Sequence, residues 1–268
     1  MTLSFAEWLR LREPADHEVR SLPLLGALLR HLPGARPLRV VDLGSGTGSN
    51  LRYLAPRLPS PQEWLLVDRD AALLSQALVR SPVDAVTTRA VPLDDLDDAA
   101  IIAGHDLVTG AALLDLVSPA WLDTLAARCR TAGAAVLFAL SYDGRTTCTP
   151  ADPEDGEMLE LFNGHQRGND HGFGTAAGPD ATTCAARSFE EAGYTVRRAR
   201  ADWHLAPEHT ALQRPLIVGW AQAISEMVPN RRDWVEAWMR RRLAYVDAGE
   251  STIMVGHEDL CGWLTPSE

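Results

Sequence analysis

Short apolar runs alternate with longer helical stretches over the first half of the chain. Apolar runs predict buried strands at 39–43, 64–67, 85–88, 107–109 and 134–140, and stretches such as 70–80 and 120–130 predict helices between them. Strands that alternate with helices of this length are typical of β-α-β units, which build a parallel sheet with helices on both faces. The hydrophobic pattern therefore predicts an α/β fold.

The pattern differs at both ends of the chain. Residues 2–31 predict two helices, the second of them after Pro14. The polar, glycine-rich stretch 141–180 predicts a long loop, and such loops are usually functional or disordered. The last elements predicted are a helix at 181–192, a strand at 194–203, helices at about 208–228 and 231–247, and a strand at 252–257.

Composition excludes several kinds of chemistry. The 268 residues include 36 acidic side chains and 25 cationic ones, all of them arginine, so the formal net charge is −11. Without lysine there can be no Schiff base, pyridoxal anchor or P-loop lysine. The acidic balance argues against nucleic acid as a partner, because that binding rests largely on cation-driven counterion release.

Cysteine usage and hydropathy indicate a cytoplasmic protein. The four cysteines lie far apart and form no CxxC pair, so neither a zinc knuckle nor a disulfide framework is indicated. The apolar runs are shorter than the roughly 18 to 20 residues that span a bilayer. The first residues also lack the apolar core of a signal peptide. We therefore expect a reducing environment and no membrane partner.

The most informative motif is VDLGSGTGSN at 41–50, where a predicted strand turns into a helix. Gly44, Gly46 and Gly48 allow a tight turn and let backbone amides approach a ligand closely. The dinucleotide pattern GxGxxG would place glycine or alanine at position 49, which is Ser49 here. The turn therefore departs from the pattern of nicotinamide and flavin enzymes.

Two acidic residues indicate a different ligand. Asp42 lies at the end of the first strand, where a carboxylate would repel a pyrophosphate and attract an ammonium group. Asp68 ends the second predicted strand and suits both ribose hydroxyls of a nucleoside. The implied ligand is a nucleoside without phosphate that carries a cation. In the alternative interpretation, Asp42 caps the turn and Asp68 is solvated at a helix start.

Asp42, Gly44, Gly46, Gly48 and Asp68 match the strand-acid-Gly-x-Gly-x-Gly signature and the acidic second strand end of one family. The sequence thus resembles the class I S-adenosylmethionine-dependent methyltransferases. The resemblance implies a seven-stranded, mostly parallel sheet with helices on both faces and an antiparallel final pair. The chain would form a single domain over 1–268: a helical cap (1–36), a cofactor-binding core (37–203), and a helical insertion with the last strand (204–268).

The resemblance also implies roles toward S-adenosyl-L-methionine. Asp42 and the turn would hold the methionine part, Asp68 would hold the ribose, and Asp94 or Asp95 would meet the adenine amino group. The candidate cofactor-binding residues are Asp42, Gly44, Ser45, Gly46, Thr47, Gly48, Asn50, Asp68, Arg69, Asp94, Thr109, Gly110 and Ala111. The N-terminal helices, with Trp8 and Arg12, either close over the cofactor or pack against the sheet edge.

The methyl acceptor is expected to be a small molecule. Thr109, Gly110 and Ala111 stand where methyltransferases of DNA and protein glutamine carry an Asn/Asp-Pro-Pro-aromatic motif, which is absent here. Those substrates are therefore disfavoured, and the acceptor pocket is expected in the 141–180 loop.

Methyl transfer from a sulfonium needs alignment, exclusion of water and, for some nucleophiles, removal of a proton. In the expected loop, His165 and His171 are suited to take a proton near neutral pH, with Asp170 orienting one of them. Asp115 and Asp143 are further catalytic candidates. The alternative for each histidine is a solvent-facing or structural role.

Candidate substrate-binding residues lie in and near the same stretch. Arg145 and Arg167 suit a substrate carboxylate or phosphate, with ordinary surface ion pairs as the alternative. Tyr142 and Trp203 either wall the substrate pocket or belong to the core. A basic face on the last long helix is either solvated or a contact in a homodimer; it comprises Arg231, Arg232, Arg240, Arg241 and Arg242.

The function expected from these observations is S-adenosylmethionine-dependent methyl transfer to a small molecule by in-line displacement. A regulatory or scaffold protein that binds the cofactor without turnover stays open. So does a metal-dependent hydrolase built on His165, Asp170, His171 and His204. Because these residues lack the compact ligand spacing of known sites, no metal is expected.

Overall fold

The computed structural model describes residues 3–34, 36–94, 96 and 99–265. The helices are α1 (Phe5–Val19), α2 (Leu22–Leu29), α3 (Ser49–Leu54), α4 (Ala71–Val79), α5 (Pro119–Ala132), α6 (Asp155–Gly168), α7 (Ala181–Glu191), α8 (Thr210–Met227) and α9 (Arg232–Asp247). The strands are β1 (Leu38–Leu43), β2 (Gln62–Asp68), β3 (Val86–Ala90), β4 (Leu107–Ala111), β5 (Ala135–Thr149), β6 (Tyr194–Arg200), β7 (Trp203–Leu205) and β8 (Thr252–Leu264).

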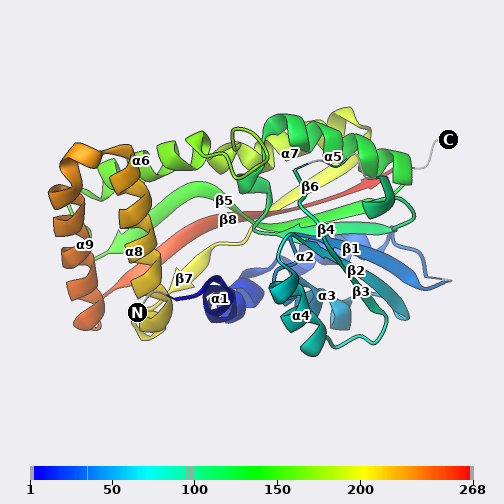
Figure 1. Cartoon of the computed structure of the whole chain (residues 1–268), viewed down its shortest axis with the longest axis horizontal. Coiled ribbons are helices and arrows are strands. Elements are labelled where there is room, and N and C mark those ends of the chain that lie inside the picture. The colour runs from blue at the N-terminus through cyan, green and yellow to red at the C-terminus, as the bar shows by residue number, and fades with distance from the viewer. Residues whose placement is uncertain (1–2, 35, 95, 97–98, 266–268) are drawn as a thin grey trace.

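A mixed sheet forms the centre of the molecule (Figure 1). Its strands lie in the order β3-β2-β1-β4-β5-β8-β6, and the short β7 pairs with β8 as an additional strand. Strands β1 to β5 are parallel, whereas β8 is antiparallel to both β5 and β6. The expected mostly parallel sheet with an antiparallel final pair is confirmed.

Helices cover both faces of the sheet (Figure 1). On one face, α5 and α7 bury an apolar core that includes Phe138 and Phe189. On the other face, α2, α3 and α4 enclose a second core around Leu28 and Trp64. Both faces of the strands are therefore buried, which accounts for the nearly continuous apolar runs in the sequence.

The strand register brings several polar residues together at the edge of the sheet formed by the carboxyl ends of its parallel strands. In the parallel ladders, Asp42 of β1 pairs with Leu66 of β2 and with Thr109 of β4. Because β1, β2 and β4 end at the same edge, the segments that follow them meet there. Ligands of open α/β sheets bind at this edge.

A helical lobe extends from one side of the sheet (Figure 1). The antiparallel pair β5 and β8 continues past the sheet core, and α6, α8 and α9 pack around its far end. The lobe has its own apolar core, which includes Trp220, Trp238 and Ile253. Since α8 and α9 lie between β7 and β8 in the chain, the expected helical insertion is confirmed.

The expected long loop at 141–180 is wrong over most of its length. Strand β5 continues to Thr149 because residues 146–149 pair with 252–255 of β8, a contact that the local sequence does not show. Residues Asp155–Gly168 form α6, in which Met158, Leu161 and Phe162 recur at helical spacing among glycine and polar residues. Helix α1 likewise continues through Pro14.

One residue of the expected basic face on the last long helix is corrected, whereas Arg231, Arg232, Arg240 and Arg241 are exposed. Arg242 is fully buried and pairs with Asp155, because α9 turns this position toward α6. Arg241 pairs with Asp152 and Glu154. The helix therefore uses these arginines within the lobe. Among the described residues, no helix has the length and apolar character needed to cross a membrane.

Candidate functional site

Glycine bends the turn between β1 and α3. Gly44, Gly46 and Gly48 have φ angles of 64°, 50° and 78°, in the left-handed region that favours glycine. The Gly46 amide donates to Asp68 Oδ2 at 2.8 Å and ties the turn to the end of β2. A Cβ on Gly46 would lie 3.0 Å from the Leu9 side chain, so α1 approaches the turn closely.

A cavity of about 390 Å³ lies at this edge, between the turn and α1. Helix α1 and the residue after it form the roof of the cavity with Phe5, Trp8, Leu9, Arg12, Asp16, His17 and Arg20. Of the predicted site residues, those that line the cavity are Gly44, Ser45, Gly46, Thr47, Asn50, Asp68, Arg69, Ala111, Asp115 and His171. Trp8 and Arg12 thus lie in the wall of the cavity, and Arg12 also lies over the ring of Trp203 in β7.

Asp42 lies beneath the cavity. It is fully buried and accepts a hydrogen bond from Asn50 Nδ2 at 2.7 Å, while its Oδ2 has no hydrogen-bond partner. Burial raises the pKa of Asp42 to about 7, against the opposing effect of Asn50. The Thr109 hydroxyl accepts from the same amide at 3.0 Å. Asp42 therefore acts on the cavity through Asn50, which reaches its wall.

The remaining predicted cofactor residues support the site from outside its wall. A Cβ on Gly110 would lie 3.0 Å from the Leu43 carbonyl oxygen, so glycine lets β4 approach β1. Gly48 is the N-cap residue of α3. Asp94 is exposed, and its neighbour Leu93 lines the cavity instead. Asp95 lies outside the described residues.

Charged residues of α1 face the cavity with partners in place. Arg12 Nε and Nη2 donate to the two carboxylate oxygens of Asp16 at 2.9 and 3.1 Å. Arg20 is only 6% exposed, donates to Asn50 Oδ1 at 3.0 Å and lies 3.7 Å from Asp259. The roof of the cavity thus carries both positive and negative side chains, and each of these has a partner.

Helix α1 is also anchored to the turn and to α3. Glu13 accepts from Arg52 Nε and Nη2 at 2.6 and 2.7 Å. His17 Nε2 lies 3.0 Å from the Ser49 hydroxyl. These contacts hold the roof down over the cavity.

Two non-glycine residues in the cavity wall have left-handed backbone conformations. Ala112 after β4 has φ 51°, and Leu140 within β5 has φ 57°. The Leu140 amide donates to Asp259 Oδ1 at 2.9 Å, which holds this conformation. Such backbone strain costs about 1 to 3 kcal/mol per residue and clusters at functional sites.

Two of the four catalytic candidates line the cavity. Asp115 lies in the short helix Leu114–Leu116 after β4, and its buried Oδ1 has no hydrogen-bond partner. Burial raises the pKa of Asp115 to about 6. His171 lies in the segment after α6, and burial lowers the pKa of its imidazole. Both groups are therefore suited to accept a proton near neutral pH.

The other two catalytic candidates lie away from the cavity. His165 is on α6, where its Nε2 lies 3.0 Å from Glu226 of α8. Asp143 is on β5 and forms an ion pair with Arg145, which also binds Asp202. Both side chains are engaged within the lobe and the β5–β8 pair.

None of the four predicted substrate-binding residues lines the cavity. Arg145 is held by its two aspartates. Arg167 pairs with Asp180 at 2.8 Å on the surface. The Tyr142 hydroxyl donates to Asn163 at 2.8 Å, and Trp203 is buried beneath the guanidinium of Arg12. Ion pairing and packing thus account for these side chains.

The histidine-containing segment does not gather metal ligands. Asp170 accepts backbone hydrogen bonds from Gly172 and Gly174, and His204 is exposed on β7. In the part of the chain that the structure describes, no group of three or more histidine, cysteine, aspartate or glutamate side chains could hold a metal ion.

Sequence reasoning named Arg12 as a residue that could close over the cofactor but missed Asp16 and Arg20, which also face the cavity. The three recur every four residues, a spacing that puts them on one face of a helix. A charged stripe of this kind on a helix with an apolar side indicates that the charged side chains could line a site. Which way the stripe faces depends on how α1 docks, which the sequence does not show.

Comparison with known proteins shows the fold. No protein-family model and no curated protein matches the sequence. The chain is 14% identical to the cyclopropane synthase MmaA2 from Mycobacterium tuberculosis, over 97% of this chain and 94% of that one, with a TM-score of 0.50. It is 14% identical to the YcgJ protein from Bacillus subtilis, over 92% and 100% of the two chains, with a TM-score of 0.55.

A third solved structure agrees with these two. It is a Bacillus halodurans protein that bears a provisional methyltransferase name, 14% identical over 92% of this chain and 99% of that one, with a TM-score of 0.55. At this identity the likeness establishes the fold, and the expected class I methyltransferase fold is confirmed.

Proposed function

We propose that this chain, which has the class I methyltransferase fold, binds S-adenosyl-L-methionine beneath α1 and transfers its methyl group to a small-molecule acceptor. The observation that carries the proposal is the cavity itself. There the glycine turn, the Asp68 carboxylate and buried oxygens without partners meet at the carboxyl ends of β1, β2 and β4.

The side chains around the cavity fit the chemical groups of this cofactor. Its ribose hydroxyls and ammonium group are hydrogen-bond donors, and Asp68, Thr47 Oγ1 and Asp115 Oδ1 are acceptors, the last two without a partner. Its carboxylate suits the Arg20 guanidinium. Its positive charge suits a cavity that Asp42 underlies.

A dinucleotide fits the same cavity less well. Asp16, Asp68 and Asp115 line the wall, and Asp42 lies beneath it. The same wall carries Arg12, Arg20 and Arg69, so repulsion of a pyrophosphate is strongest at the glycine turn itself, where Asp68 accepts from the Gly46 amide. Together with Ser49 in place of the third glycine of the dinucleotide pattern, this favours a nucleoside cofactor without phosphate.

The protein's own part in the reaction is positioning, exclusion of water and proton transfer. The cofactor supplies a methyl group on a sulfonium, whose sulfur is a good leaving group. Trp8 and Leu9 of the roof, together with Phe173 from the segment after α6, give the cavity an apolar lining that excludes water. Asp115 is the candidate to accept a proton from an acceptor hydroxyl or amine, with His171 as the second candidate.

The presence of the roof also favours a small-molecule acceptor over a macromolecule. A cavity of about 390 Å³ beneath α1 has the size of pockets that hold small molecules. A folded protein or duplex nucleic acid could not enter it without displacement of the helix.

The proposal is tested by binding and turnover measured on the same preparation. Calorimetry gives the affinity for S-adenosylmethionine, and formation of S-adenosylhomocysteine is followed with separate pools of small amines, phenols, carboxylic acids and thiols. We expect one site of micromolar affinity and turnover with one pool. Asp68→Ala should weaken binding at least tenfold, about 1.4 kcal/mol, because the ribose loses its acceptor.

Asp84→Ala is the matched control, because Asp84 is an exposed carboxylate just before β3, near the amino ends of the parallel strands and away from the cavity. Equal affinity in wild type and Asp68→Ala would remove the ribose assignment. Binding without turnover in any pool would favour a regulatory or scaffold protein. Absence of binding would contradict both functions.

A further inference from the structure

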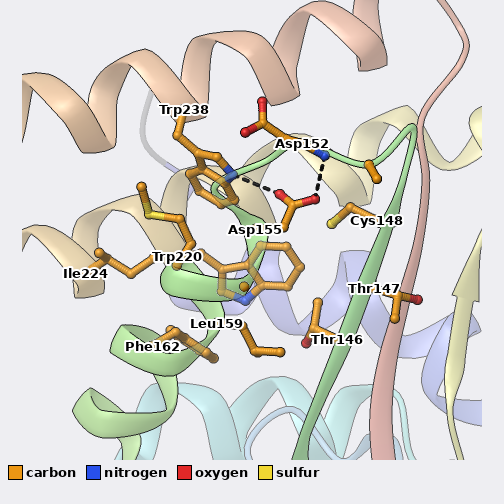
Figure 2. Close-up of a pocket in the computed structure, with 13 residues that line it drawn as sticks. Thr146, Thr147, Cys148, Asp152, Asp155, Leu159, Phe162, Trp220, Ile224 and Trp238 are labelled. Carbon is orange, nitrogen blue, oxygen red and sulfur yellow. Dashed lines mark hydrogen bonds between the residues drawn. The ribbon is translucent and has the colours of Figure 1, made fainter.

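A second cavity, of about 260 Å³, lies inside the helical lobe (Figure 2). It is lined by the far half of β5 and by α6, α8 and α9, and part of it is open to solvent. Its apolar wall consists of Met158, Leu159, Phe162, Trp220, Ile224 and Trp238. Of the residues that the structure describes, none lines both this cavity and the one beneath α1. The second cavity is therefore a separate site.

Aromatic rings dominate the wall of the second cavity. The indole of Trp220 lies across it, with Trp238 on the side of α9 and Phe162 on the side of α6 (Figure 2). Trp220 is 7% and Trp238 3% exposed, so both rings are fixed by packing. Rings held in this way favour stacked or edge-to-face contact with another aromatic ring.

The carboxylates at the rim of the second cavity are already neutralised. Asp155 accepts hydrogen bonds from Trp238 Nε1 at 2.9 Å, from Arg242 Nε at 3.0 Å and from the Asp152 amide at 2.9 Å (Figure 2). Asp152 in turn accepts from Arg241 Nε at 2.7 Å. The cavity therefore offers no unpaired charge to a charged ligand.

One hydroxyl group remains for a polar contact. Thr146 lines the cavity from β5, and its buried Oγ1 has no hydrogen-bond partner. Buried polar atoms in native proteins nearly always have a partner. A single N–H or O–H group on an otherwise apolar ligand would supply it.

The walls cannot close to fill this space. Arg242 is fully buried, pairs with Asp155 and donates to the Pro150 carbonyl at 2.6 Å, so it fastens α9 to α6 and to the end of β5. Protein interiors are otherwise close-packed. An apolar cavity of about 150 Å³ is enough to bind benzene, so this larger one has room for two fused rings.

We propose that the second cavity binds an uncharged, planar aromatic molecule of about two fused rings that carries one hydrogen-bond donor. The ring packs between Trp220, Trp238 and Phe162, and its donor meets Thr146 Oγ1. This site goes beyond the proposed methyl transfer and does not depend on it.

Calorimetry on the full chain tests the site with indole as the probe. Indole-3-acetate and tryptamine carry the same ring with a negative or a positive charge. We expect indole to bind saturably at one site and both charged analogues to bind at least tenfold more weakly. Leu159→Trp adds a third indole to the cavity wall, fills part of the space and should weaken indole binding at least tenfold. Val218→Trp, at a position 44% exposed on α8, should leave it unchanged.

A crystal soaked with 5-bromoindole locates the ring even if Leu159→Trp fails to fold. We expect the bromine signal between Trp220 and Phe162. Three results would overturn the proposal: no saturable heat with indole up to its solubility limit, equal affinity in a folded Leu159→Trp protein, or a bromine signal only beneath α1 or on the surface.

Discussion

Asp42 and Asp115 are carboxyl groups removed from solvent next to the proposed cofactor. Burial raises the pKa of Asp42 to about 7 and that of Asp115 to about 6, whereas an unperturbed aspartate titrates near 4. The ionised forms are therefore disfavoured in the empty protein. A bound cation would stabilise both of them, which couples the protonation of these residues to ligand binding.

Asp115 predicts a pH dependence of the reaction. If Asp115 accepts the proton of the acceptor, kcat/KM should rise as the pH increases through about 6, where the carboxyl of the ligand-free protein ionises. Asp115→Asn should remove this rise and lower kcat about 100-fold. The measurement is the pH profile of kcat/KM for both proteins. Asp143→Asn is the control, and loss of the rise in that variant alone would move the proton acceptor to Asp143.

Asp42 predicts a pH dependence of stability. Because its pKa is higher in the folded protein than in the unfolded chain, the contribution to stability is present below pH 4 and is lost as the pH rises through about 7. Asp42→Asn keeps an oxygen for Asn50 and should raise the free energy of unfolding at pH 8 by up to about 4 kcal/mol. It should give no such gain at pH 4.

Urea unfolding of wild type and Asp42→Asn without cofactor measures this difference at both pH values. A difference that is the same at pH 4 and pH 8 would mean that folding does not raise the pKa of Asp42.

At the residue scale, the sequence located the site through a local motif. The glycine turn and Asp68 depend only on the chain near a strand end, so they could be assigned before the structure was known. His165 and Arg145 could not be excluded in this way. Their partners Glu226 and Asp202 are 61 and 57 residues away, and the fold alone brings them together.

Helix α1 is the element that completes the cavity. Its attachment rests on Glu13, which contacts Arg52 and lies 3.3 Å from Arg80. Because the roof makes no strand pairing of its own, these polar contacts and the packing of Trp8 and Leu11 hold it in place. The rate at which the roof opens should therefore limit the release of a bound cofactor.

Loss of the Glu13 contacts should make cofactor release faster. Glu13→Ala removes both arginine contacts and should raise the dissociation rate of S-adenosylhomocysteine about tenfold, with a smaller change in the association rate. Stopped-flow tryptophan fluorescence measures both rates. Glu18→Ala is the matched control, because Glu18 is exposed on the same helix. Equal dissociation rates in the two variants would contradict a lid held by Glu13.

At the element scale, periodicity predicted the helices and strands wherever the pattern was long and local. It failed at 141–180 because the continuation of β5 depends on its antiparallel partner β8, more than 100 residues later in the chain. It also missed α6, whose short apolar stripe is flanked by Gly156 and Gly164.

At the scale of the whole molecule, the sheet and the lobe hold separate cavities with different chemistry. The cavity at the sheet edge is lined by charged residues of both signs, whereas the cavity in the lobe is aromatic and its charges are paired. The sheet order could be expected from the motif and its resemblance. The packing of α6, α8 and α9 around a cavity could not, because it depends on long-range contacts such as Arg242 with Asp155.

A crystal structure grown with S-adenosylhomocysteine would show whether the cavity beneath α1 is an S-adenosylmethionine site. We expect one molecule between the glycine turn and α1, with its ribose hydroxyls on Asp68 and its sulfur facing the Asp115 side of the cavity. A cavity that stays empty at saturating ligand, or that takes NAD in its place, would rule out this cofactor.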